Sequence, residues 1–430
     1  MIVIFNVIVC ACHCENDDDD SADDDDTPLM DDDNDTSDDD SDDDSVDDDS
    51  DDDSSDDDTD DDTADDDDSL TRWCTSLTTA PQLEQWTWDA VLVAEYESKS
   101  SNHPVFSSVY GNTVWAMFTR HIDEQHYFYL GKYDDGEWSE WQVVGPEHVG
   151  QSICDVHVDN DGVWTIYVDP YNYRFAMDLS VVRWENGEIV EDIPVCDTGL
   201  LTSPHLYRHA DGRFVLMYID GGGQNTIMEQ TEEGDFQRQT YEEYGSKNPV
   251  LGPDGLVHAM SQPFPFVIYY EGSGLTPFEY SVIGYGLPFS GSYTSPYMGM
   301  TSDGVLVTSP ILSDERIWLQ RYDGVNLDFS LWTPEKPERK LNSYPCGGVD
   351  AHDRPVVAIA TFDSKPRVLC TMIHDESGIQ AYVVDAPINK NGSWWCMDEM
   401  AFGIEVITFD ILVTSNSENA DYQYLVIGTR

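Results

Sequence analysis

A short run of carboxylates, Asp155, Asp159 and Asp161 followed by Gly162, is the part of this sequence that most resembles a metal-binding loop. Closely spaced aspartates beside a glycine turn can supply the oxygen ligands that Ca²⁺ takes, but the glutamate that closes an EF-hand loop is missing. The same Asp-Gly step also recurs at regular intervals along the chain. We therefore interpret the segment as a turn, and we expect no metal site and no cofactor.

Residues for hydrolytic catalysis do not stand out. Glycoside hydrolysis needs two carboxylates across a pocket, and 86 acidic residues are too many to single out a pair. Gly272-Ser273-Gly274 lacks the strand-to-helix elbow of a serine hydrolase, and the histidines are too scattered for a metal-dependent one. The sequence therefore identifies no catalytic residue and favours a protein without catalytic activity.

Aromatic residues are the other source of chemistry, with 12 Trp and 23 Tyr. Aromatic faces with polar neighbours suit sugar or peptide binding. Ring side chains at the starts of β-rich runs are our candidate ligand-binding residues. They are His103, His205, Tyr293, Tyr344, Trp394 and Trp395. The alternative for each is that it packs in the core.

The elements that would position these residues follow from a repeat. A proline, a β-rich run, an Asp-Gly-type turn and a second β-rich run recur along the chain, as in Ser203-Pro204 to Tyr218. The glycine of the turn, or its equivalent, lies at positions 111, 162, 212, 255, 304, 354 and 403, at intervals of 43 to 51 residues. Each unit continues into a second hairpin, for example over 127–144 and 179–190. Four short strands repeated seven times predict an all-β, seven-bladed β-propeller.

The seventh unit is one strand short. Its expected strands cover 393–402, 404–412 and 422–428, and the segment 86–94 resembles the fourth strand of the first unit at 137–144. We predict that this N-terminal strand completes the last blade, because closing the ring removes exposed strand edges.

Six cysteines accompany the repeats: Cys74, Cys154, Cys196, Cys346, Cys370 and Cys396. Their spacing contains no Cys-x-x-Cys pair, so a zinc site is not expected. In an exported protein an even number suggests disulfides, but six cysteines allow 15 pairings, and free buried thiols are the alternative.

The acidic residues divide the chain. Residues 15–68 contain 34 aspartates, one glutamate and no Lys or Arg, and they account for about half of the net charge of −66. Such a segment cannot bury enough apolar surface to fold, so we predict a disordered tether that reaches at most about 180 Å. Weak, non-specific Ca²⁺ association is expected there. The charge also excludes nucleic acid as a partner.

The first fourteen residues, MIVIFNVIVCACHC, resemble a bacterial lipoprotein signal, with Val9-Cys10-Ala11-Cys12 at the place of a lipobox. That resemblance implies a lipid anchor on Cys12; an ordinary secretory signal is the alternative. We therefore divide the chain into a signal region (1–14), a tether (15–68), a lead-in segment (69–85) and a propeller (86–430).

The repeated Ser/Asn-Pro to Asp-Gly pattern resembles exported bacterial propellers of the BNR or sialidase-like kind. No copy has the spacing of a true Asp-box, because glycine follows aspartate directly, as at Asp161-Gly162. The resemblance thus implies architecture without sialidase activity. We expect a monomeric binding or scaffolding module for protein or glycan ligands, held in the outer membrane or at the cell surface by its lipid anchor. A secreted protein is the alternative location, and an exported glycoside hydrolase-like enzyme the alternative function.

Overall fold

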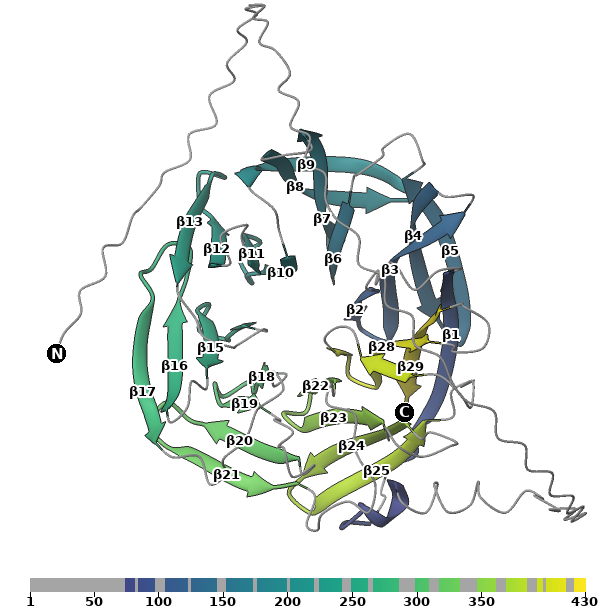
Figure 1. The fold of residues 1–430 in the computed structure, drawn as a ribbon, viewed down its shortest axis with the longest axis vertical. Coiled ribbons are helices and arrows are strands. Elements are labelled where there is room, and N and C mark those ends of the chain that lie inside the picture. The colour runs from purple at the N-terminus through teal and green to yellow at the C-terminus, as the bar shows by residue number, and fades with distance from the viewer. Residues whose placement is uncertain are drawn as a thin grey trace, which may run out of the picture. The chain divides into compact units, whose positions relative to one another are not determined.

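Seven four-stranded antiparallel blades form a ring in the computed structural model of this chain, as the repeat predicts (Figure 1). The structure describes residues 74–81, 84–96, 105–122, 125–144, 152–172, 176–198, 202–219, 224–241, 249–261, 266–285, 298–308, 317–332, 346–360, 369–384, 393–396, 400–414 and 421–430. The predicted signal region and aspartate tract lie outside these residues. No described helix is long and apolar enough to cross a membrane.

Each blade runs from the centre of the ring outwards in chain order. Blade 1 contains β2 (Phe106–Tyr110), β3 (Thr113–Ile122), β4 (Gln125–Asp134) and β5 (Glu137–Val144). Blade 2 contains β6 (Ser152–Asp159), β7 (Gly162–Asn172), β8 (Ala176–Glu185) and β9 (Glu188–Thr198). Blade 3 contains β10 (Thr202–Arg208), β11 (Phe214–Ile219), β12 (Asn225–Gln230) and β13 (Phe236–Tyr241). Blade 4 contains β14 (Val250–Leu251), β15 (Val257–Ser261), β16 (Phe266–Gly272) and β17 (Glu279–Tyr285).

The remaining blades follow the same order. Blade 5 contains β18 (Met298–Met300), β19 (Leu306–Thr308), β20 (Trp318–Tyr322) and β21 (Leu327–Leu331). Blade 6 contains β22 (Cys346–Val349), β23 (Pro355–Ala360), β24 (Leu369–Asp375) and β25 (Gly378–Val384). Blade 7 contains β26 (Ser393–Cys396), β27 (Ala401–Phe402), β28 (Val406–Thr414), β29 (Asp421–Thr429) and the N-terminal β1 (Thr87–Tyr96).

The core lies between the blades, and it explains the continuous apolar runs of the second strands. On β11, Val215 and Met217 pack towards blade 4, whereas Phe214, Leu216 and Tyr218 pack towards blade 2. Successive side chains of a strand point to opposite faces, and both faces of this blade are covered. A strand buried on both faces therefore reads as an unbroken hydrophobic segment instead of an alternating one.

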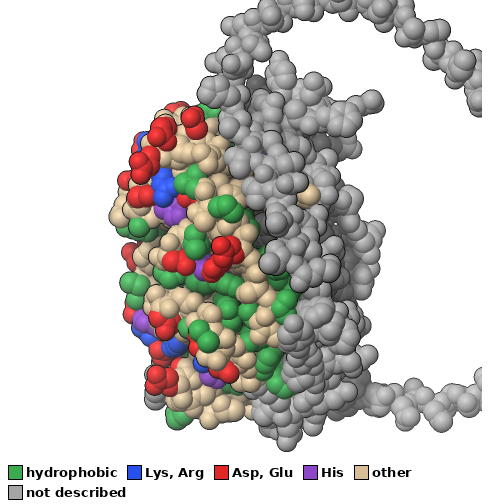
Figure 2. Space-filling model, turned by 90° about the vertical axis from the view of Figure 1, so that its left-hand side faces the viewer, with side chains coloured by type: hydrophobic (Ala, Val, Ile, Leu, Met, Phe, Trp, Pro, Cys, Tyr) green, Lys and Arg blue, Asp and Glu red, His purple; other side chains and the backbone are tan. Residues whose placement is uncertain are grey.

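The turns between the first and second strands connect neighbouring blades through polar contacts. Arg208 of blade 3 binds Asp159 and Asp161 of blade 2, the carboxylates that resemble a calcium loop. Ser302 of blade 5 donates its backbone N–H to Asp353 of blade 6 at 2.6 Å. Figure 2 shows acidic side chains along the described surface, with basic and histidine side chains among them. Carboxylates of the Asp-Gly turns thus serve to join the blades.

Ring closure occurs in blade 7 as predicted, with β1 paired antiparallel to β29 from Thr87–Thr429 to Tyr96–Asp421. A Cβ atom added to Gly428 of β29 would meet the Trp88 ring at 2.5 Å, so this tryptophan lies directly over the glycine. Trp138 on β5 covers Gly131 of β4 in the same way. The N-terminal strand therefore takes the place of an outer strand and also places a tryptophan over a glycine, although Trp88 is paired directly with Gly428 and Trp138 reaches Gly131 diagonally.

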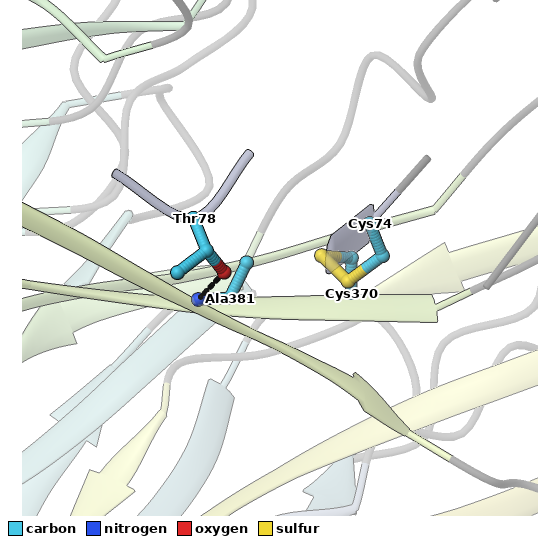
Figure 3. Close-up of a disulfide and its surroundings, with 4 residues drawn as sticks. All are labelled: Cys74, Thr78, Cys370 and Ala381. Atoms are coloured by element: carbon cyan, nitrogen blue, oxygen red, sulfur yellow. Dashed lines mark hydrogen bonds between the residues drawn. A yellow bond between two sulfur atoms is a disulfide. The ribbon is translucent and has the colours of Figure 1, made fainter. Parts of the chain in front are cut away.

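The segment before β1 is attached to blade 6 (Figure 3). Cys74, in one helical turn over 74–76, forms a disulfide with Cys370 of β24. Thr78 Oγ1 accepts a hydrogen bond from the backbone N–H of Ala381 on β25 at 3.1 Å. Cys346 is also disulfide-bonded.

Candidate ligand-binding surface

The residues selected from sequence lie partly outside the described part of the chain. Cys12, His103, Tyr293 and Tyr344 lie outside the described residues. Trp394 and Trp395 belong to β26, where their backbones pair with Val413 and Leu412 of β28, but their side chains lie outside the described part. These assignments stay predictions.

His205 is the one candidate whose side chain the structure describes. It lies on the inner strand β10 and is only 7% exposed. Burial lowers the pKa of its imidazole, and the nearby Asp155 carboxylate partly opposes that shift. Asp155 is the extra residue of a β-bulge in β6, at a φ of +59°, and its carboxylate accepts a hydrogen bond from the backbone of Leu206. His205 is thus a neutral, buried histidine at the junction of two inner strands.

An exposed aromatic surface occurs instead on the side of blade 1 that faces blade 2. Trp115 of β3 and Trp141 of β5 stack with ring centroids 6.2 Å apart and an interplanar angle of 23°. Lys132 of β4 places its ammonium group 5.6 Å from the centroid of the Trp115 ring. Trp141 remains 37% exposed. We name Trp115, Lys132 and Trp141 the tryptophan platform.

Strand register explains why these side chains share one face. Trp115 is paired with Lys132 across β3 and β4, and Leu130 with Trp141 across β4 and β5. Paired residues of antiparallel strands project to the same side, as do residues two apart on one strand. The Asp135-Gly136 turn between β4 and β5 has positive φ at both residues, a geometry that fixes the register of a two-residue hairpin. The two tryptophans are therefore positioned by backbone pairing and not by a loop.

Polar groups border the platform on the side of the described turns. Lys132 Nζ forms an ion pair with Asp134 at 2.6 Å, and Thr113 Oγ1 donates to the same carboxylate at 3.3 Å. The hydrogen bond from Lys132 is the main reason that the pKa of Asp134 is lowered, so Asp134 is ionised at neutral pH. Tyr110, 43% exposed, donates its hydroxyl to Asn160 of blade 2. Hydrogen-bonding groups thus flank an aromatic face.

Blade 2 borders the platform on another side through its β8–β9 turn. A Cβ atom on Gly187 would lie 3.7 Å from Cβ of Trp141 and 4.0 Å from Cγ1 of Val143. Both turn residues, Asn186 and Gly187, have positive φ, as a tight two-residue hairpin requires. The turn supports the base of the Trp141 side chain and leaves the ring partly exposed.

Other ionisable side chains among the described residues form hydrogen bonds with one another inside the propeller. His258 contacts Tyr269 Oη through Nδ1 and Asp254 through Nε2, while Tyr269 donates to Glu271. Burial, followed by the hydrogen bond to Glu271, raises the pKa of Tyr269, so its hydroxyl stays protonated. The described residues contain no group of three or more His, Cys, Asp or Glu side chains that could hold a metal ion.

The tryptophan platform was not among the residues selected from sequence. Its signal was present in Trp115 and Trp141, each of which lies in a strand that the repeat predicts, within 113–118 and 137–144. Trp164 occupies the corresponding position in blade 2, but Arg208 and Phe214 of blade 3 cover its ring, and it is 2% exposed. Which tryptophan stays accessible depends on the neighbouring blade, and a single repeat does not contain that information.

Comparisons with known proteins find resemblance in shape. No protein family and no curated protein matches the sequence. Among solved structures, virginiamycin B lyase from Staphylococcus aureus is 12% identical with a TM-score of 0.45, covering 80% of this chain and 100% of its own. Polysaccharide lyase Uly1 is 11% identical with a TM-score of 0.49, covering 80% and 99%. The β-propeller domain of the Trilobed protease from Pyrococcus furiosus is 12% identical with a TM-score of 0.43, covering 75% and 93%.

Proposed function

We propose that this chain is an exported, lipid-anchored surface protein whose propeller binds a glycan on the tryptophan platform. The observation that carries the proposal is the stacked, partly exposed Trp115–Trp141 pair, held by strand register beside Lys132, Asp134 and Thr113. The apolar face of a sugar ring packs against an indole, while its hydroxyl groups find donors and acceptors at the edge.

The charges around the tryptophan platform favour a neutral glycan over an acidic glycan as the ligand. Lys132 is the cation of the platform, and Asp134 already neutralises it. Asp135 and Glu137 are exposed in the adjoining turn, so the local surface is acidic. A sugar acid would meet repulsion from this acidic surface, because the one cation of the platform, Lys132, is already paired with Asp134, whereas a neutral sugar would not.

A protein ligand and a catalytic role are less well supported. The platform is small, with two rings and one ammonium group, while a stable protein–protein interface buries about 800 Å² on each partner. The well-buried carboxylates in the described residues are engaged, as Asp350 is with Arg354 at 2.8 Å. Glycoside hydrolase-like activity therefore stays a prediction from sequence alone.

Glycan binding can be tested on an array of neutral and uronate-containing oligosaccharides. We expect wild type to bind neutral members, and Trp141→Ala to bind them at least about tenfold more weakly, which corresponds to about 1.4 kcal/mol. Tyr280→Ala is the matched control, because Tyr280 is 55% exposed on β17 of blade 4, away from the platform. Thermal midpoints of both variants verify that the fold is retained.

Two results would contradict the proposal. One is binding by Trp141→Ala equal to that of wild type, which would place any glycan elsewhere. The other is a preference for uronate-containing glycans, which would contradict the inference from charge.

A further inference from the structure

The lead-in segment makes its contacts with the propeller in a fixed order along the chain. The first is the disulfide from Cys74 to Cys370 of β24. The second is a set of hydrogen bonds to β25, including those from the backbone N–H groups of Thr79 and Ala80 to Ile379 O at 2.9 and 3.2 Å. Only after these does β1 begin to pair with β29, at Thr87.

Glu84 adds a polar contact between the disulfide and β1. One carboxylate oxygen lies 3.0 Å from Arg354 Nη1 of blade 6, and the other lies 2.6 Å from Arg430 Nη1. Burial by itself would raise the pKa of Glu84, but the hydrogen bond and charge of Arg354, with the charge of Arg430, hold the pKa below its usual value. The segment 74–86 therefore spans from blade 6 to the closing strand of blade 7.

We propose that the Cys74–Cys370 disulfide is a tension clamp, which transfers force on the N-terminal residues 1–73 into blade 6 and bypasses the closing strand β1, because β1 lies inside the loop that the disulfide closes. Any pull on those residues reaches Cys74 before any other described contact, and there it meets a covalent bond to a central strand. The inference extends the proposed function, because a propeller anchored through its N-terminal tether would experience such a pull when its ligand is held elsewhere.

Without the disulfide, the same pull would act on weak contacts in succession. The hydrogen bonds to Ile379 and the ion pairs of Glu84 are each far weaker than a covalent bond. The load would then reach Thr87–Thr429, the first pair of the closing ladder. Because pairs at one end of an edge strand can open one at a time, the ring would open at its closure.

Single-molecule stretching of the full chain between its two ends tests the clamp without glycan or membrane, so its outcome is separate from that of the glycan test. Residues 75–369 lie inside the covalent loop closed by the disulfide, which spans 296 residues. In the oxidised protein, unfolding of the propeller can add only the length after Cys370, roughly 200 Å at about 3.4 Å per residue. Cys370→Ser should release roughly 1,000 Å more, the length of the opened loop at about 3.4 Å per residue.

Cys346→Ser is the matched control, since it removes a disulfide-bonded cysteine outside the Cys74–Cys370 pair and leaves the clamp in place. We expect it to keep the short extension. Should Cys370→Ser fail to fold, adding reductant to stretched wild type should produce the same additional length. Long extensions from the oxidised wild type, or equal extensions from wild type and reduced protein, would overturn the proposal.

Discussion

Glu229 shows how one buried charge is used in the fold. It is 3% exposed on β12, and its Oε1 lies 3.2 Å from His209 Nε2 and 3.0 Å from Arg213 Nη1. Burial by itself would raise the pKa of Glu229. Hydrogen bonds from His209 and Ser273, together with the charges of His209 and Arg213, hold the pKa below its ordinary value of 4.5. The ionised carboxylate therefore stabilises blade 3 next to the Ser273 turn of blade 4.

The pH dependence of stability follows from the direction of that shift. A carboxylate whose pKa is lower in the folded state stabilises the fold above its unfolded pKa, and this stabilisation is lost as pH falls through the folded pKa. We expect Glu229→Gln to reduce the free energy of unfolding by about 1–3 kcal/mol at neutral pH, with the difference from wild type shrinking below pH 4.5. Urea unfolding between about pH 3 and pH 7 measures this difference. Glu232→Gln, exposed in the same hairpin, is the control for removing a carboxylate that is not buried. A pH-independent effect of Glu229→Gln would disprove the assignment.

At the scale of elements, the closing strand depends on a glycine. We predict that Gly428→Ala destabilises the propeller by about 1–3 kcal/mol, because the new Cβ atom would lie 2.5–2.8 Å from the Trp88 ring and force β1 to shift. The thermal midpoint should fall accordingly.

A double substitution separates this clash from other effects of alanine. In the Trp88→Ala background the indole ring is gone, so Gly428→Ala should lower the free energy of unfolding by less than it does in the wild type. The losses of stability of the two single variants should therefore not add in the double variant. If the losses of stability of the two single variants do add, Gly428 has a role other than making room for the Trp88 ring.

Sequence periodicity predicted the strands well where each blade repeats the same hairpins. The expected hairpin at 127–144 corresponds to β4 and β5, and that at 179–190 to β8 and β9. The prediction was less accurate at 393–402, where one strand was expected and β26 and β27 are separate. Cys396 pairs with Ile411 and Ala401 with Thr408, so the inner side contains two more residues than its partner β28. The pairing between neighbouring strands determines where such an insertion occurs. The alternation of apolar and polar residues within one strand does not show it.

The binding surface was harder to predict than the fold for a related reason. Alternation places Trp115 and Trp164 at equivalent positions, yet one is partly exposed and the other is covered from blade 3. Contacts between blades decide accessibility, and they involve residues about 50 positions apart. His205, chosen from its place at the start of a strand, is buried for the same reason.

At the scale of the whole molecule, the charge of −66 divides between the N-terminal aspartate tract and the remaining chain. The tract is the predicted tether, and Cys12 is the proposed anchor. We expect Cys12→Ser to move the protein from the membrane fraction to the soluble fraction of an expressing bacterium, with the propeller still folded. Cys14→Ser is the matched control and should stay with the membrane. Unchanged fractionation of Cys12→Ser would rule out lipidation at this residue.

The disulfide between Cys74 and Cys370 also orders events during synthesis. Ribosomes add about 5–20 residues per second, so the 296 residues between the partners take roughly 15 to 60 s to appear. Throughout that interval Cys74 lacks its disulfide partner and β1 lacks the strand β29 with which it pairs, while Cys154, Cys196 and Cys346 emerge before Cys370 does. If disulfides formed in the order in which the thiols leave the ribosome, Cys74 would be joined to a cysteine that precedes Cys370. Correct maturation of this ring therefore calls for a slow oxidant or for an isomerase that reshuffles early pairs.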